Sequence, residues 1–359
     1  MAHGLSLPTL DVSYLRTTLT RLLLTPSPVG DTERGIELCR ELVCALAPQE
    51  VHLTRKGALV ATIEGEANDA PRAVTAHIDT LGAVVKGIKE NGRLLMAKLG
   101  GIQWGTVENE GVTLFTESGQ QFRGSIVLSN ASHHLYAESS GPQNVERTDQ
   151  TIELRLDART TSEAETRALG IEVGDFIAFD PRPEWNEGFI RSRFLDDKAC
   201  LAVLFTALKA LHDAGLRPAQ TVTVLIPNYE EVGHGGASGM PRSVADVLAL
   251  DVAPIGTGQN SDEYSCSLCA RDADGPYDRT MRRHLLRLAR EHDIALKMDA
   301  FVEYCSDGDA LWKAGADVRV ALIGPGTDAT HGYERTHEDA LIATAQMVLA
   351  FLLDEKLSR

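Results

Sequence analysis

The segment from Asp196 to Glu231 constrains the fold most, because it places acidic pairs at both ends of one α/β unit. Asp196 and Asp197 open an apolar helix, and the strand 221–227 that follows leads to Glu230 and Glu231. Neighbouring carboxylates repel one another, so they cluster inside a protein where something offsets the repulsion, and a bound cation commonly does so. A divalent metal ion is the common cation of this kind. The segment therefore predicts a metal site at the ends of an α/β unit.

Helical and extended patterns alternate on both sides of this segment. Such alternation predicts an α/β fold, with a mostly parallel sheet covered by helices on both faces. We expect helices at 10–24, 32–47, 279–291 and 339–353, and strands at 51–55, 59–63, 73–76, 248–251 and 316–323.

The character of the chain changes between residues 90 and 183. Helical periodicity nearly disappears there, and short β-like pieces are punctuated by Gly, Asn and Ser. Unstructured loops of that length are rare in compact proteins. We therefore expect a catalytic α/β domain formed by residues 1–89 and 184–359. Residues 90–183 are expected to form an inserted small all-β domain, which could cap a pocket or make oligomer contacts.

Composition narrows the classes of function. The chain has 359 residues, which suits two domains, and its net charge of −16 repels the phosphates of nucleic acid. No apolar run approaches the ~18 residues that a membrane span needs. The six cysteines are scattered, and no basic and apolar leader precedes them. These features predict a cytoplasmic protein that binds neither nucleic acid nor membrane.

Candidate ligands for metal ions follow the expected strands, where α/β proteins gather their functional groups. Two histidines and three carboxylates suit a pair of borderline divalent ions, with zinc first and cobalt or manganese as alternatives. One carboxylate of the double aspartate would bridge the two ions. The candidates are His77, Asp196 or Asp197, Glu231, Asp251 and His331.

Two further acids have roles of their own. Glu230 and Glu231 are adjacent, so we expect one of them to bind metal and the other to face the substrate, where it can take a proton from metal-bound water and pass it to the leaving nitrogen. Asp79 lies two residues after His77 and is expected to orient its ring.

Each of these motifs is weak by itself. A His-x-Asp triplet is common, a double aspartate often caps a helix, and a glutamate pair often lies in a solvated turn. His337 competes with His331 as the last ligand, but Glu338 and Asp339 after it suit a helix start. The metal-site hypothesis depends on all the motifs falling at strand ends of one domain.

Together these residues resemble a known family. The segments that carry the resemblance are Ala76–Gly82, Leu195–Ala199, Glu230–Gly233, Asp251, and His331 with Glu334. They are similar to the dimetal aminopeptidases that form tetrahedral particles, the forty-second metallopeptidase family, which includes glutamyl aminopeptidases and members labelled endoglucanase. The resemblance covers nearly the whole chain.

The resemblance implies a role for each candidate and an oligomer. The fold would be a phosphorylase/hydrolase-like α/β domain, and the inserted β domain would drive assembly of a homo-oligomer, often a dodecamer. In this family's arrangement the metal ligands would be His77 and Asp251 for one ion, Glu231 and His331 for the other, and Asp197 as the bridge. Glu230 would be the general base and acid, and Asp79 would orient His77.

Three departures from the family pattern lie near the expected substrate site. Thr80 stands where the family usually has Glu, and His234-Gly235 stand where it usually has Arg-Gly. The loop 326–337 also differs and is similar to a subgroup associated with metabolism of a small acetylated dipeptide-amide osmoprotectant. The departures concern substrate specificity more than metal binding.

We therefore expect a dimetal hydrolase that cleaves amide bonds of peptides or short peptide-like substrates, as an aminopeptidase does. One alternative is a deacylase or amidohydrolase of N-acylated amino acids or dipeptides, which would need a cation such as Arg335 or Arg271 to bind a carboxylate. A second alternative is a catalytically silent assembly protein.

Overall fold

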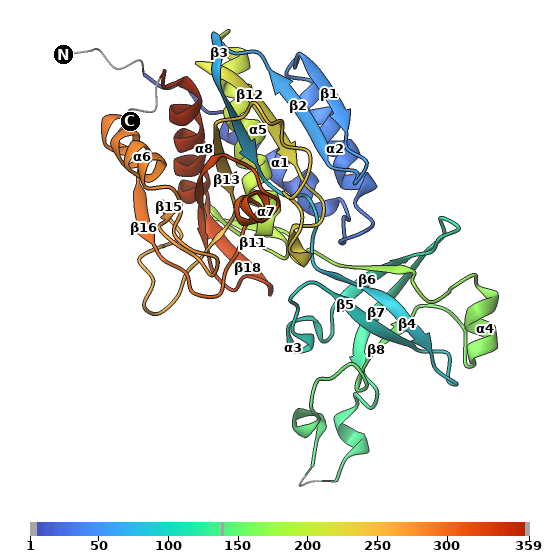
Figure 1. Cartoon of the computed structure of the whole chain (residues 1–359). Coiled ribbons are helices and arrows are strands. Elements are labelled where there is room, and N and C mark those ends of the chain that lie inside the picture. The colour runs from blue at the N-terminus through green and yellow to red at the C-terminus, as the bar shows by residue number, and fades with distance from the viewer. Residues whose placement is uncertain (1–5, 138–139, 356–359) are drawn as a thin grey trace. The chain divides into compact units, whose positions relative to one another are not determined.

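The computed structural model describes residues 6–137 and 140–355, which fall into two compact units (Figure 1). The first unit contains the chain up to Asp79 and from Arg182 onward, and the second is Thr80–Pro181. The second unit therefore begins at residue 80 and ends at 181, whereas the sequence suggested 90 and 183. The earlier start arises because the strand β4 (Gly82–Ile88) pairs within the second unit.

The first unit is built on one mixed sheet. Its middle strands β12, β3, β13 and β17 run parallel, whereas β2 and β15 are antiparallel to their neighbours β12 and β17. The short β14 (Ala253–Pro254) pairs with β17. The order across the sheet is β1 (Glu50–Leu53), β2 (Leu59–Ile63), β12 (Gln220–Ile226), β3 (Ala67–Thr75), β13 (Asp246–Leu250), β17 (Arg319–Thr327), β15 (Cys266–Cys269) and β16 (Leu296–Asp299).

Helices cover both faces of this sheet, as the α/β prediction requires. Figure 1 shows α7 in front of the sheet and α1 and α5 behind it. The helix α5 packs against α1 and α8 and is apolar on almost every side, which is typical of a fully buried helix. The helices are α1 (Val12–Leu24), α2 (Glu33–Cys44), α5 (Leu195–Asp213), α6 (Arg279–Glu291), α7 (Asp307–Lys313) and α8 (Glu338–Leu353).

A small antiparallel sheet connects two distant parts of the first unit. It consists of β10 (Glu184–Asn186), β11 (Phe189–Ser192) and β18 (Glu334–His337). Ser192 pairs with Glu334, so the chain entering α5 lies beside the chain entering α8. This pairing was absent from the sequence interpretation, and it brings the region before Asp196 to the loop after β17.

The second unit is a closed antiparallel barrel. Alternate side chains point inward and are fully buried, among them Met96, Leu114 and Ile126. The prediction of an inserted all-β domain is therefore confirmed. Its strand order is β4, β5 (Leu94–Leu99), β8 (Ile152–Leu156), β7 (Gln121–Leu128), β6 (Gly111–Phe115) and β9 (Phe176–Phe179), with short helices α3 (Trp104–Val107), α4 (Glu163–Ala168), η1 (His133–Leu135) and η2 (Pro142–Asn144) between strands.

Two further properties of the described residues bear on the sequence analysis. Over 6–137 and 140–355, every helix is too short or too polar to cross a bilayer.

All six cysteines are free, and Cys266 and Cys269 are buried in β15, where burial raises the pKa of each thiol to about 12.

Candidate metal centre

The four parallel strands deliver the candidate ligands to one edge of the sheet. His77 follows β3, Asp251 follows β13 and His331 lies in the loop after β17. Glu231 follows β12 on the single turn η3 (Glu230–Val232). Because the carboxyl ends of parallel strands lie at the same edge, residues far apart in sequence meet there.

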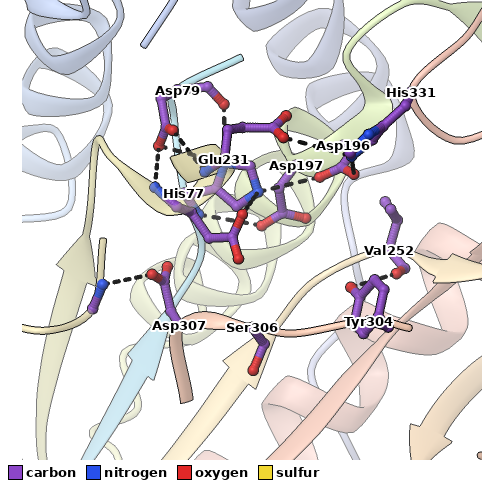
Figure 2. Close-up of polar contacts among 12 residues, drawn as sticks. His77, Asp79, Asp196, Asp197, Glu231, Val252, Tyr304, Ser306, Asp307 and His331 are labelled. Carbon is purple, nitrogen blue, oxygen red and sulfur yellow. Dashed lines mark hydrogen bonds and ion pairs between the residues drawn. The ribbon is translucent and has the colours of Figure 1, made fainter. Parts of the chain in front are cut away.

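Two groups of metal-binding atoms share one residue, Asp196. The first group is His77, Asp196 and Asp251, and the second is Asp196, Glu231 and His331; within each, the ligand atoms lie within 4.8 Å of one another. We call these five residues the strand-end cluster. The Asp196 Oδ1 atom lies 3.2 Å from His77 Nε2, and its Oδ2 atom lies 3.6 Å from His331 Nε2 (Figure 2). A carboxylate whose two oxygens face two different ligand groups is placed to bridge two ions.

Asp197, which the sequence analysis had favoured as the bridge, belongs to neither group. Its Oδ2 atom instead accepts a hydrogen bond from the backbone N–H of His77 at 3.2 Å. Asp196 and Asp197 have non-helical backbone angles at the start of α5, so their side chains leave the chain in different directions. This local backbone geometry, which sequence spacing does not reveal, places Asp196 at the centre.

Asp79 is fully buried, and its carboxylate forms hydrogen bonds with the backbone of the glutamate pair, Glu230 and Glu231. Its two carboxylate oxygens accept from the amide N–H groups of Glu230 at 3.2 Å and Glu231 at 3.1 Å. Its carbonyl oxygen lies 3.0 Å from Nδ1 of His77, closer than its carboxylate at 3.6 Å. An Nδ1–H that donates to this carbonyl leaves the Nε2 lone pair free for a metal ion.

Glu230 lies beside the first ligand group without belonging to it. Its Oε2 atom is 3.7 Å from His77 Nε2, and its side chain is mostly buried. Glu231 contributes Oε2, which lies 3.5 Å from His331 Nε2. The side chains of these two consecutive residues of η3 therefore point to different positions: Glu231 belongs to the second ligand group, and Glu230 lies beside the first.

Glu334 connects the loop that carries His331 to Asp196 through hydrogen bonds. Its two buried oxygens accept from the backbone N–H of Asp196 and of His331, each at 3.1 Å. His331 itself has a positive φ of 62°, a conformation that is uncommon outside glycine. His337, the competing candidate, caps α8 and belongs to neither ligand group.

The electrostatics of the strand-end cluster favour bound cations. Burial raises the pKa of Asp251 and Glu231, and the nearby Asp196 carboxylate raises both further. Burial opposes protonation of His77, but hydrogen bonds to Asp196 and Asp79 raise its pKa. Within the described residues, the buried Oδ1 atoms of Asp197 and Asp251 have no hydrogen-bond partner. Imidazole nitrogens and unpaired carboxylate oxygens are a donor set that fits divalent ions.

Two residues near the cluster were missed by the sequence analysis. Tyr304 donates its hydroxyl hydrogen to the carbonyl of Val252 at 2.8 Å, next to Asp251. Asp307 begins α7 and accepts from the Gly236 N–H at 2.6 Å. The capping box in front of α7 is a sequence signal for a helix start, but it does not indicate that this helix begins beside the strand-end cluster.

Comparison with known proteins assigns the family. The profile of the M42 glutamyl aminopeptidase family matches residues 57–347. A putative aminopeptidase of Bacillus subtilis, YhfE, is 40% identical over 335 residues, which cover 93% of this chain and 96% of that protein. The chain belongs to the M42 peptidase family. The prediction of a hydrolase that cleaves peptide amide bonds is thereby confirmed, and the family implies bound divalent metal ions.

A more distant sequence relative and two solved structures are also similar to this M42 peptidase. Lysyl aminopeptidase of Pyrococcus furiosus is 26% identical over 226 residues, covering 61% of this chain and 60% of that protein. A TET aminopeptidase from a Thaumarchaeota archaeon superposes with a TM-score of 0.84 at 18% identity, covering 95% of this chain and 96% of that chain. An endoglucanase-labelled protein of Thermotoga maritima gives 0.72 at 14% identity, covering 94% and 97%. The resemblance stated from the sequence motifs is therefore confirmed.

Proposed function

We propose that this M42 peptidase is a dimetal aminopeptidase that removes the first residue of peptides or short peptide-like substrates. The observation that carries the proposal is the position of Asp196, whose two oxygens face His77 and His331. His77, Asp196 and Asp251 would hold one ion, and Asp196, Glu231 and His331 the other. The shared carboxylate supports a paired site better than two independent ones.

Two divalent ions at these positions, zinc by preference and cobalt or manganese as alternatives, would act as Lewis acids that activate water and polarise the scissile carbonyl. Glu230 would accept the proton of the attacking water on a carboxylate oxygen and then donate it to the leaving nitrogen. Asp79 would keep Glu230 in place through its backbone amide and would fix the His77 ring through its own carbonyl.

An excess of negative charge supports a free-amine substrate over an acylated one. Two divalent ions would not neutralise all the carboxylates around the site, and the remaining charge would attract an ammonium group. Arg335, suggested as a carboxylate clamp for a deacylase, pairs with Glu263 and lies over the ring of Phe189. The acidic residues in question are Asp79, Asp196, Asp197, Glu230, Glu231, Asp251, Asp307 and Glu334.

We further propose that the chain forms a homo-oligomer in the cytoplasm. A solved structure named PhTET1-12s, which shares the fold at a TM-score of 0.81 and 20% identity, is described as a dodecamer. The six free cysteines agree with a reducing compartment. Mass photometry of the purified protein would measure the assembly directly, and a monomer would contradict this part of the proposal.

Metal analysis coupled to a substrate panel tests the proposed function. The purified chain is expected to carry about two divalent ions and to hydrolyse p-nitroanilides of free amino acids. The same compounds with an acetylated amine should be poor substrates. Faster cleavage of the acetylated compounds would favour the deacylase, and metal loading with no hydrolysis of either set would favour the assembly protein.

A further inference from the structure

Asp307 is a buried acid beside the strand-end cluster to which no role has yet been given. The Ser306 side chain caps α7, so the helix starts at Asp307, whose side chain is buried. Figure 2 shows that this carboxylate points toward the side of the cluster where His77 lies. Asp307 belongs to neither ligand group, so it is free to contact something other than metal.

One oxygen of Asp307 is anchored by the glycine-rich loop after the glutamate pair. Its Oδ1 atom accepts from the Gly236 N–H at 2.6 Å. A Cβ on Gly235 would lie 2.5 Å from that oxygen and 2.8 Å from the amide nitrogen of Glu230. The absence of a side chain at residue 235 therefore lets Asp307 and the backbone of Glu230 approach each other closely.

The second oxygen of Asp307 accepts no hydrogen bond from any residue that the structure describes. The nearby cation, Lys56, is engaged elsewhere: its Nζ donates to the carbonyl of His234 at 2.5 Å and lies 5.4 Å from the Tyr229 ring. Burial raises the pKa of Asp307 to about 7. Asp307 is therefore a buried carboxylate with one oxygen anchored and with no ion pair to a cation among the described residues, although the charge of Lys56 acts on it from nearby.

The Asp307 carboxylate lies close to the backbone of Glu230, the residue that would move the proton, because one Cβ position on Gly235 would be within 2.8 Å of both. Burial raises the pKa values of Glu230 and Asp251, and the charge of Asp307 raises both further. In a peptide the α-nitrogen is only one carbon away from the scissile carbonyl. A group that binds this nitrogen must therefore adjoin the residue that donates a proton to the leaving nitrogen.

We propose that Asp307 binds the α-ammonium group of the substrate and so selects peptides with a free N-terminus. This inference rests on the proposed aminopeptidase function. The Gly236 N–H holds one carboxylate oxygen, and the other receives the ammonium in a charge-assisted hydrogen bond. Asp307 would thereby set the distance between the N-terminus and Glu230, which restricts cleavage to the first peptide bond.

The test compares Asp307→Asn with wild type on two matched p-nitroanilides, one with a free α-amine and one with hydrogen in its place. Asparagine keeps an oxygen for the Gly236 N–H but removes the charge, so anchoring and charge are separated. The free-amine preference, as a ratio of kcat/KM values, should fall at least about tenfold, mainly through KM, because a hydrogen bond to a charged group is lost. Activity on the compound without the amine should change less than about twofold.

Glu303→Gln is the matched control, because it removes one negative charge from the exposed segment just before α7. It should leave the preference unchanged. Metal content and melting temperature are measured for every variant. If Asp307→Asn does not fold, Asp307→Ser, which also keeps an oxygen at the start of α7, is assayed in the same way.

The outcomes separate this inference from the proposed function. Wild type that prefers acetylated compounds would overturn both. Wild type that prefers free amines, with the preference intact in Asp307→Asn, would overturn the role of Asp307 alone. An equal loss of kcat on both compounds would mean that Asp307 positions Glu230. A loss confined to lysine or arginine p-nitroanilides would mean that Asp307 binds a basic side chain of the substrate. Either result would also overturn the inference.

Discussion

The barrel and the α/β unit both bury carboxylates, and they neutralise them in different ways. In the barrel, the side chain of Glu153 is fully buried on β8 and forms ion pairs with Lys89 and Arg93. In the strand-end cluster, the partners of Asp196 and Glu231 in ion pairs are histidines alone, as far as residues 6–137 and 140–355 show. The barrel thus provides its own cations for a buried acid, whereas the cluster gathers acids without them.

This difference separates a structural use of buried charge from a functional one. A buried carboxylate paired with cations of the same chain is compensated within the fold, and removing one partner of such a pair lowers stability. A cluster of carboxylates that repel one another lowers stability until cations arrive from outside. We expect substitutions in the two regions to differ in kind: changes in the cluster should act through metal binding and turnover, and changes at Glu153 through stability alone.

The largest expected effect is the replacement of the central ligand. Asp196→Asn should abolish measurable turnover and lower the metal content at both positions, because each ligand group loses its shared carboxylate. Asp197→Asn is the matched comparison. It should retain more metal, since Asp197 bonds the backbone of His77 and belongs to neither group. Metal quantification decides the point; a variant at Asp197 that loses both ions while Asp196→Asn keeps them would reverse the assignment.

Glu230→Gln should come next. Removing a general base typically lowers kcat by about 10²–10⁴-fold, and because Glu230 is outside both ligand groups the metal content should stay normal. Glu231→Gln provides the contrast, since it should reduce metal content as well as rate. Steady-state kinetics with metal-loaded protein measure the effect, and near-normal rates for Glu230→Gln would contradict its assigned role.

Removal of metal by a chelator should lower the free energy of unfolding of the protein by a few kcal/mol. A ligand that binds only the folded state stabilises it by about 4 kcal/mol when its free concentration exceeds the dissociation constant ~1,000-fold. Repulsion among the carboxylates lowers stability further once the metal is gone. Thermal melts with and without chelator should therefore differ by several degrees, and added zinc should restore the transition. An unchanged melting temperature after verified metal loss would mean that the cluster does not depend on cations.

The smallest effect is expected in the barrel. Glu153→Gln should cost about 1–2 kcal/mol, because the buried position loses its charge while Lys89 and Arg93 still reach water. The loss should be the same with and without chelator, and metal content and kcat should not change. Denaturant unfolding measures the cost, and a change in metal stoichiometry would break the distinction between the two regions.

Local patterns in the sequence determined much of the fold. The 3.6-residue and two-residue periodicities predicted α1, α2, α6, α8, β2 and β12 to within about three residues, because side-chain burial on one face is a local property. The change of character around residue 90 indicated the inserted all-β unit, although its first strand was assigned to the α/β domain. The candidate ligands were recognised because parallel strands present their ends at one edge.

The tertiary structure alone decided how those candidates are arranged. Asp196 and Asp197 are adjacent and chemically identical, so only the backbone angles at the start of α5 determine which one faces both histidines. Asp307 comes from a helix whose capping signal is ordinary, and it reaches the site only because α7 packs against β13 and β17. Sequence spacing records which groups lie near strand ends, but the direction of each side chain depends on the local backbone geometry and on how the helices and strands pack against one another.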